Sequence, residues 1–178
     1  MNLLFRLLWV MLRATLSAKH SPIMTPANLQ FRVWLTDQDM FLHMTNSRYL
    51  SFSDLGRMDL FIRSGFRGVV KNEQWSTEIC GQTMTINRML KAPKLFTLET
   101  QLHGWDDQFL VIGQRFMRNG KNHAGVVTLL ELHDRSGTFV PPQSLIDQIE
   151  PGVAPPPLSQ AFTDLIASTN TSRSSENQ

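Results

Sequence analysis

Residues 37–65 read DQDMFLHMTNSRYLSFSDLGRMDLFIRSG. From Ser47 to Ser64, apolar residues recur at steps of three and four, which is the period of an amphipathic helix. Asn46 is a natural N-cap, because its side chain can accept hydrogen bonds from the free amides of a first helical turn. Gly65 is a natural stop just past the other end. The stretch therefore predicts one long helix, directly preceded by a polar loop that contains two acids.

Strand patterns lie on both sides of this helix. Residues 29–35 alternate apolar and polar side chains, as a half-buried strand does. After the helix, the pattern predicts four more strands joined by short turns, over residues 83–90, 96–103, 109–116 and 124–132. Such meanders form antiparallel sheets. One long helix behind a curled antiparallel sheet is the hot-dog arrangement, an α+β fold, and the alternative is a generic α+β domain.

Length and composition suit one globular domain. The chain has 178 residues, of which 42% are hydrophobic, enough for a core. We assign residues 26–150 to this domain, which closes with a short helix over 141–150. Residues 151–178 are rich in Pro, Ser, Thr and Asn and predict a flexible tail, interrupted by one apolar patch. The patch contains Phe162, Leu165 and Ile166.

Charge and cysteine content exclude several classes of protein. The formal net charge is +2, with +4 on residues 1–36 and −2 on the remainder. There is no basic stripe with interleaved aromatic residues, so we expect no nucleic-acid partner. Cys80 is the only cysteine, which excludes an intrachain disulfide and a cysteine-rich metal site. A single free cysteine fits a reducing cytoplasm.

The N-terminal arm, residues 1–25, predicts an amphipathic helix. Residues 2–18 read NLLFRLLWVMLRATLSA, and the longest uncharged apolar run is far shorter than the roughly 20 residues that a membrane-spanning helix needs. At helical spacing, the polar residues form one narrow stripe and the rest is apolar or small. The helix lies in a membrane interface, or it packs on its own domain or a dimer partner. A signal peptide is a third and weaker reading, because Arg6 interrupts the apolar region. The stripe consists of Asn2, Arg6, Arg13 and Ser17.

The loop and helix also carry a resemblance. The order of a strand, then D-x-D-x-x-x-H-x-x-N-x-x-Y, then a long helix resembles the hot-dog thioesterases of the 4-hydroxybenzoyl-CoA type. Residues 97–116, TLETQLHGWDDQFLVIGQRF, and 137–145, GTFVPPQSL, are similar to bacterial proteins related to animal thioesterase superfamily member 6. The resemblance covers about residues 29–147. Its motif positions are Asp37, Asp39, His43, Asn46 and Tyr49.

The resemblance implies an enzyme that hydrolyses an acyl-CoA or acyl carrier protein thioester to a free acid and a thiol, without a metal or redox cofactor. It assigns catalysis to Asp39, as general base on water or as nucleophile. His43 either assists Asp39 or the substrate, or holds the loop by a backbone hydrogen bond. Asp37 is then a turn residue or strand end. The bulky residues 40–42 offer a desolvating wall that would raise the basicity of Asp39.

The remaining substrate contacts follow from the same resemblance. Asn46 marks a helix start whose free amides and positive dipole suit the thioester carbonyl. Gly81 offers a second carbonyl-binding amide, or merely allows a bend. Tyr49 is expected to be packed, with its hydroxyl beside the site. Arg88, with Lys91 and Lys94, forms a basic cluster for CoA phosphates, or is simply solvated.

Hot-dog domains resemble one another in dimerising, which implies a homodimer or homotetramer here. The alternative function is a non-catalytic acyl-CoA or lipid-binding protein, held at membranes by residues 1–18. A hot-dog hydratase or dehydratase is a third reading, but the histidine–acid pairing it needs on the helix is not evident. Both leading readings place the protein in the cytoplasm, and the second adds peripheral contact with a membrane.

Overall fold

The structure, a computed structural model, describes residues 3–16 and 20–176. Its twelve elements follow one another in a simple order: an N-terminal helix, a strand, two helices, a run of strands and two further helices. In chain order they are α1 (Leu3–Leu16), β1 (Ala27–Arg32), a 3-10 turn η1 (Leu35–Asp37), α2 (Asn46–Arg63), α3 (Phe66–Asn72), β2 (Ser76–Ile86), β3 (Leu95–Trp105), β4 (Leu110–Arg118), β5 (Lys121–His133), β6 (Phe139–Val140), α4 (Pro142–Ile149) and α5 (Gln160–Glu176).

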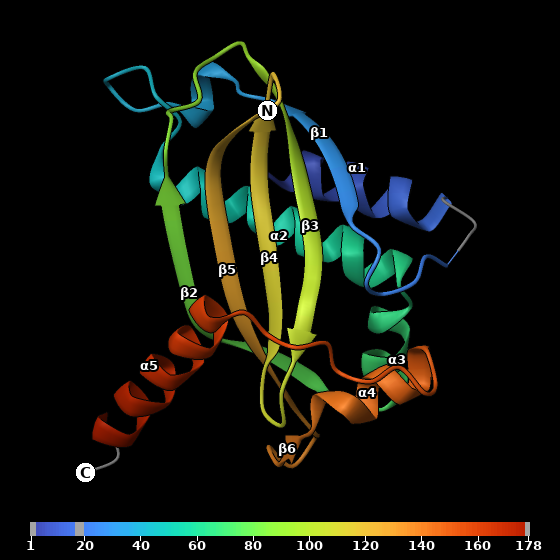
Figure 1. Cartoon of the computed structure of the whole chain (residues 1–178). Helices are drawn as coiled ribbons and strands as arrows, with labels where there is room; N and C mark the ends of the chain where they lie inside the picture. Colours follow the sequence, from blue (N-terminus) through green and yellow to red (C-terminus); the bar gives the residue numbers. More distant parts are fainter. Residues whose placement is uncertain (1–2, 17–19, 177–178) are drawn as a thin grey trace.

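The strands form one antiparallel sheet in the order β1-β3-β4-β5-β2, with β6 paired to β5. Helix α2 crosses behind this sheet, and α1 lies beyond β1 on the same side (Figure 1). The predicted hot-dog fold is therefore confirmed. Strand β2 forms one edge and β1 the other, so the single chain leaves both edge strands unpaired on one side.

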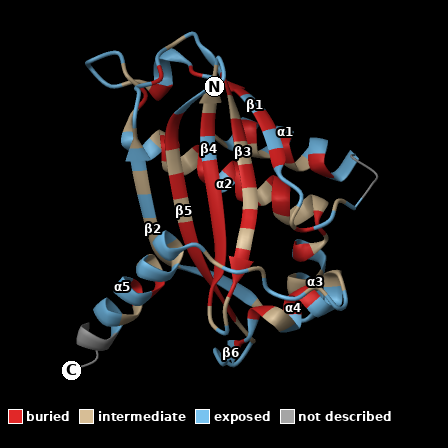
Figure 2. Cartoon of the chain, viewed as in Figure 1, coloured by how far each residue is buried: buried red, intermediate tan, exposed pale blue. Residues whose placement is uncertain are grey.

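Helix α2 begins and ends one residue earlier than the sequence pattern predicts. Its apolar stripe faces the sheet, and Gly65 follows the helix with a φ of 84°, a conformation that glycine adopts at little cost. The buried rings of Phe31, Phe52 and Phe96 meet here, with centroids 4.9 and 5.1 Å from Phe52 to its two neighbours. Buried residues continue along β3, β4 and β5 (Figure 2). Aromatic burial of this extent accounts for much of the core.

The helix also contacts the sheet through a polar seam. The amide of Gln114 donates hydrogen bonds to the Ser53 carbonyl, at 2.9 Å, and to Thr100 Oγ1, at 3.0 Å. Gly56 packs against this seam: a Cβ at that position would lie 2.6 Å from Gln114 Nε2 and closer still to Thr100 Oγ1. A glycine is needed here because the helix backbone approaches the sheet so closely.

We expect Gly56→Ala to lower the free energy of unfolding by about 1–3 kcal/mol, because the added methyl overpacks the seam. Urea unfolding measures this change. Gly68→Ala is the matched control, since a Cβ at Gly68 meets nothing within 4 Å; there alanine is expected to be neutral or to stabilise α3 by up to about 1 kcal/mol. Equal stability of the two variants would contradict the close approach.

Several elements differ from the sequence prediction. β2 starts at Ser76, well before the predicted start at residue 83, because its first residues pair with the end of β5. Helix α3 was not predicted. The hairpin expected at Asn119-Gly120 is confirmed, with φ of 50° and 69° at the two residues, as a tight type I′ turn requires.

The C-terminal segment is not the fully flexible tail that its composition predicts. Residues 160–176 form α5, which begins on the outer face of the sheet beside β2 and extends beyond that edge (Figure 1). Its residues Phe162, Leu165 and Ile166 pack with Phe109, Val111 and Leu129. These sheet residues face away from α2 and would otherwise expose an apolar surface, which explains why a polar-rich segment becomes ordered there.

Candidate functional site

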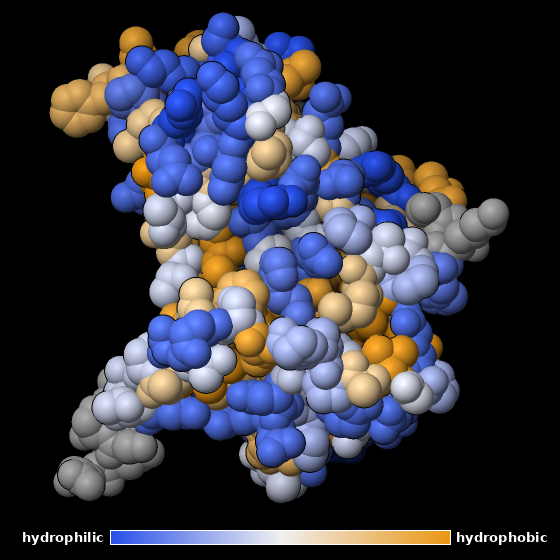
Figure 3. Space-filling model, viewed as in Figure 1, coloured by the Kyte–Doolittle hydropathy of each residue, from blue (hydrophilic) through white to orange (hydrophobic). Residues whose placement is uncertain are grey.

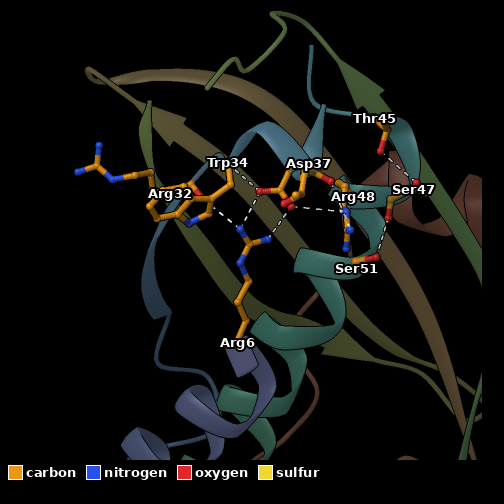
Figure 4. A network of polar contacts seen from close by, with 9 residues as sticks. Arg6, Arg32, Trp34, Asp37, Thr45, Ser47, Arg48 and Ser51 are labelled. Carbon is orange, nitrogen blue, oxygen red and sulfur yellow. Dashed lines mark hydrogen bonds and ion pairs between the residues drawn. The ribbon is translucent and has the colours of Figure 1, made fainter. Parts of the chain in front are cut away.

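Asp37 organises the loop before α2. Its carboxylate is fully buried and accepts two hydrogen bonds from Arg6 of α1, at 2.8 and 2.7 Å, and one from the Trp34 amide, at 2.8 Å. Arg48 of α2 lies 3.5 Å away (Figure 4). The Thr45 amide donates to the Asp37 carbonyl at 3.0 Å. Asp37 does end a turn, as expected, but it also holds together α1, the loop and the start of α2.

Asp39 lies two residues further on, at the surface. Its Oδ1 accepts the amides of Phe41, at 2.9 Å, and His43, at 3.2 Å. The Asp39 amide in turn donates to the His43 carbonyl at 2.9 Å, which closes the loop. Within the described residues, Oδ2 of Asp39 accepts no hydrogen bond and the half-buried His43 ring contacts no carboxylate. Asp39 therefore combines a turn-stabilising oxygen with one that is open to solvent.

The bulky residues after Asp39 do not form the expected wall. Met40, Phe41 and Leu42 are 86%, 71% and 62% exposed. Apolar side chains accordingly project from the loop at the upper left of the space-filling view (Figure 3). Leu42 has a φ of 59° and closes a turn in which its amide donates to the Asp39 carbonyl at 3.1 Å. In the single chain these side chains and Asp39 are all exposed to solvent, so the predicted desolvating wall is wrong for this form of the molecule.

The N-terminus of α2 carries unpaired amides. Thr45 is the N-cap, not Asn46, which is the first helical residue and is exposed. No side chain caps this end, because the Thr45 hydroxyl pairs with the Ser47 hydroxyl at 3.1 Å. The amides of Asn46 and Ser47 find no acceptor in the part of the chain that the structure describes. Such an end of a long helix attracts a negatively charged oxygen.

Tyr49 and Arg88 lie at the same end of the domain. Tyr49 is fully buried, its Oη accepts the Leu90 amide at 3.1 Å, and burial raises the pKa of its hydroxyl. The Leu90 carbonyl accepts the Met44 amide at 2.8 Å, so Tyr49 ties the segment after β2 to the site loop. The exposed Arg88 side chain belongs to this segment. Tyr49 is thus a packed residue, as expected, whose hydroxyl is already engaged.

Gly81 lies elsewhere, at an irregularity in the middle of β2. A Cβ there would lie 2.7 Å from Thr169 Oγ1 of α5. Helix α5 therefore covers the residue that the resemblance offered for carbonyl binding. The structure brings Asp39, His43 and Asn46 together at one end of α2 but leaves Gly81 beneath another element.

The sequence analysis missed a second candidate acid, Asp54, which lies on α2 itself. Asp54 pairs with Arg57, whose Nη1 donates to Thr128 Oγ1 at 3.1 Å; Gln82 of β2 donates to the same oxygen at 3.0 Å. The Asp54 side chain is 63% exposed, yet desolvation raises the pKa of its carboxyl, opposed by the charge of Arg57. Burial of Arg57 lowers the pKa of its guanidinium. The i, i+3 spacing of acid and arginine was the available sequence signal.

Another buried carboxylate, Glu131, anchors α5. It accepts hydrogen bonds from Gln108, at 2.6 Å, from Arg173 of α5, at 2.5 Å, and from the Cys80 thiol, at 3.1 Å. Burial acts to raise the pKa of Glu131, but these hydrogen bonds outweigh it and lower the pKa. Burial, together with the hydrogen bond to Glu131, raises the pKa of Cys80 to about 12. This thiol is a poor nucleophile.

We therefore expect Cys80 to react with iodoacetamide roughly 10³-fold more slowly than free cysteine at about pH 8, because the thiolate fraction is that much smaller. The rate of alkylation, followed by mass spectrometry, checks this. In urea the difference should vanish, which serves as the control. Alkylation of the folded protein within about threefold of free cysteine would contradict the shielded thiol.

Taken together, an antiparallel sheet around one long helix and an acid loop at the helix start define a hot-dog protein of the thioesterase class. A sequence profile of the thioesterase-like superfamily matches residues 33–163. The chain belongs to this superfamily, and membership indicates thioester hydrolysis. Among the described residues, no group of three or more histidine, cysteine or acidic side chains is placed to hold a metal ion.

Two curated relatives have similar sequences. Protein THEM6 of Xenopus laevis is 32% identical over 97 residues, which make up 54% of this chain and 47% of that protein. Protein THEM6 of Danio rerio is 26% identical over 140 residues, or 79% of this chain and 68% of that protein. The match thus spans less than half the length of the frog protein.

Solved structures share the fold. The probable thioesterase YbaW from Escherichia coli has a TM-score of 0.65 at 16% identity and covers 70% of this chain and 96% of its own. The gentisyl-coenzyme A thioesterase BH1999 has a TM-score of 0.60 at 16% identity and covers 67% and 98%. At such identities the likeness establishes the fold and leaves the substrate open.

Proposed function

We propose that the protein hydrolyses acyl thioesters of CoA or acyl carrier protein to a free acid and a thiol. One observation carries this proposal. The start of α2 has free amides, and the adjoining loop carries Asp39, whose Oδ2 is open to solvent. The amides of Asn46 and Ser47 suit the thioester oxygen, on which negative charge develops during attack. The carboxylate suits the attacking water or the acyl carbon.

The chemistry of hydrolysis divides between loop and helix. In one route, Asp39 takes a proton from water, whose oxygen attacks the thioester carbon; the C–S bond then breaks and the thiolate leaves, taking up a proton. In the other, Asp39 attacks the carbon itself and expels the thiolate, which leaves an acyl anhydride that water cleaves to the free acid and the Asp39 carboxylate. His43 is held near it by the main chain and is available to contact the substrate or relay a proton. Asp54 is a second candidate carboxylate, which lies on α2 itself, and desolvation raises the pKa of its carboxyl, as suits a base. Substitution of each acid separates their roles.

The thiol carrier is proposed to be CoA or the phosphopantetheine arm of acyl carrier protein. Arg88 and its neighbours Lys91 and Lys94 are exposed on the segment that Leu90 ties to the site loop. Exposed cations at this place suit the carrier's phosphates. BH1999, which shares the fold, is a gentisyl-coenzyme A thioesterase, and this supports the choice of CoA.

We further propose a cytoplasmic homodimer or dimer of dimers. The unpaired edge of β2, eleven residues long, is a suitable pairing surface, because an exposed edge strand carries free amides and carbonyls. Gln82 of this strand contacts Thr128, which also binds Arg57. A β2–β2 pairing would therefore bring the Asp54–Arg57 group close to a partner subunit. Light scattering after size-exclusion chromatography measures the oligomeric state.

A second function is a non-catalytic acyl-CoA or lipid-binding protein that contacts membranes through α1. The observations that favour it are the exposed Asp39, whose Oδ1 already stabilises a turn, and six exposed apolar side chains on α1. In this reading the loop binds the thioester without cleaving it. Binding of acyl-CoA with no release of thiol would be its signature.

The deciding experiment incubates the purified full chain with acyl-CoAs of short, medium and long chain and follows free thiol with a chromogenic disulfide. Acyl carrier protein thioesters form a parallel series. Time-dependent thiol release above the buffer rate supports the hydrolase. Acyl-CoA binding in calorimetry without thiol release from any substrate overturns it in favour of the binding protein.

A further inference from the structure

Helix α1 buries Arg6, one residue of its predicted polar stripe, against the domain. Arg6, Val10 and Ala14, at steps of four, are its buried residues, and Val10 joins the core beneath α2 and β1. The Arg6 guanidinium lies 4.6 Å from the centroid of the Phe52 ring and forms the ion pair with Asp37 (Figure 4). Of the four residues of the predicted polar stripe, Arg6 is wholly buried and Arg13 is exposed, whereas Asn2 and Ser17 lie outside the described residues.

The opposite side of α1 is apolar and exposed. Its large side chains are each at least 45% exposed. They recur at three- and four-residue steps and form one face, which we call the outer face of α1: Leu4, Phe5, Leu8, Trp9, Leu12 and Leu16. A contiguous apolar surface of this kind marks an interaction site on a soluble domain. No described helix is long and apolar enough to cross a membrane.

Basic residues border the outer face. Arg13 lies on α1 itself, with its guanidinium 5.8 Å from the Trp9 ring, and reaches the Asn28 carbonyl of β1 at 3.4 Å. Arg32 and Lys94 are exposed where β1 ends beside β3. Residues 1–36 contain no acid. Apolar side chains flanked by cations complement an interface of acyl chains and anionic headgroups.

A second copy of the chain fits this surface less well. A symmetric dimer places the same patch of each subunit against the other, so the cations around the two outer faces would meet. An anionic bilayer instead neutralises them while it covers the apolar side chains. Charge complementarity therefore selects the lipid surface as the occupant.

We propose that the outer face of α1 is a docking surface for a bilayer that contains anionic lipids, and that the Arg6–Asp37 ion pair holds this face outward. The pair fixes the helix to the domain before it meets a membrane, so docking does not require α1 to fold on the lipid. Asp37 also begins the loop that carries Asp39. A bilayer bound to α1 thus lies next to the element that forms the candidate site, where long-chain acyl groups partition.

Flotation of the full chain with liposomes tests the proposal. We expect the protein to float with vesicles of phosphatidylcholine and phosphatidylglycerol at about 3:1, and to bind pure phosphatidylcholine vesicles and vesicles in about 0.5 M NaCl more weakly. The double variant Leu8→Gln/Leu12→Gln should lower the vesicle-bound fraction at least about tenfold, because both side chains belong to the outer face. Circular dichroism confirms that the variant is folded.

Matched controls separate the outer face from general hydrophobicity. Ile79→Gln/Met89→Gln removes two residues that are each 48% exposed and lie off α1; it should float like the wild type. Flotation of the Leu8/Leu12 variant equal to the wild type overturns the proposal. The proposal is also overturned if the wild type binds no vesicle and the Leu8/Leu12 variant changes from dimer to monomer. In that case a second copy of the chain, rather than a bilayer, covers the outer face of α1. Thiol release from a short-chain acyl-CoA is measured separately, so loss of hydrolysis and loss of docking remain distinct.

Discussion

Replacing Asp39 by asparagine is expected to lower kcat/KM for acyl-CoA hydrolysis about 10²–10⁴-fold, the range that a general acid–base residue contributes. Asparagine keeps an oxygen where Oδ1 accepts the Phe41 and His43 amides. It replaces the open Oδ2 by an amide nitrogen, which neither takes a proton nor attacks a carbonyl. The loop should therefore persist while the chemistry is lost. Steady-state kinetics of thiol release measure the effect, and thermal unfolding confirms the fold.

Asp54→Asn is the matched control for this result. It likewise replaces one exposed carboxylate by an amide, on α2 instead of the loop, and leaves Asp39 and the free amides in place. If Asp39 carries the reaction, Asp54 takes no part in the chemical step and affects it only through its ion pair with Arg57. Asp54→Asn should then retain activity within about tenfold. A larger loss in Asp54→Asn than in Asp39→Asn would reverse the assignment. Unchanged turnover in both variants would place the reactive carboxylate elsewhere.

The second large effect concerns stability. Asp37→Asn is expected to lower the free energy of unfolding by about 3–5 kcal/mol, because it leaves the Arg6 cation buried without its partner. Both side chains are at most 1% exposed, so water cannot replace the lost carboxylate. A loss of this size is a large part of the roughly 5–15 kcal/mol that typically stabilises a domain. Urea unfolding of variant and wild type measures it.

Two further variants test the cause of that loss. Asp107→Asn changes an exposed acid and should alter stability by no more than about 0.5 kcal/mol. The double variant Arg6→Met/Asp37→Leu removes both charges and should recover most of the stability, because a buried ion pair replaced by apolar residues is often neutral or stabilising. A double variant as unstable as Asp37→Asn would show that shape, rather than charge, dominates at this position.

Periodicity and turn chemistry predicted most of the fold. The apolar steps through α2 and the alternation in β3, β4 and β5 are local signals, and the Asn119-Gly120 turn joins β4 and β5 as expected. The candidate site was partly predictable for the same reason. Asp39, His43 and the start of α2 are close in sequence, so finding the loop also found their neighbourhood.

The features of the fold and site that the sequence did not predict depend on contacts between residues far apart in the chain. The Asp37–Arg6 pair joins residues 31 positions apart, and nothing in either local pattern links them. The composition of the C-terminal segment predicted flexibility because its stabilising contacts belong to the outer face of the sheet rather than to the segment itself. The position of Gly81 under α5 was unpredictable for the same reason, since the element that covers it could not be placed from the sequence.

Two ion pairs connect the terminal helices α1 and α5 to buried acids of the domain, and they affect where the folding unit begins and ends. Arg6 of α1 ends on buried Asp37, and Arg173 of α5 ends on buried Glu131. The superfamily match, residues 33–163, contains both acids and neither arginine. An excised segment with those bounds would keep both buried carboxylates but lose the two arginines that bind them most closely, and Asp37 would retain only the more distant Arg48. Helices α1 and α5 are thus integral to the charge balance of this hot-dog domain, so homology boundaries are not the boundaries of its folding unit.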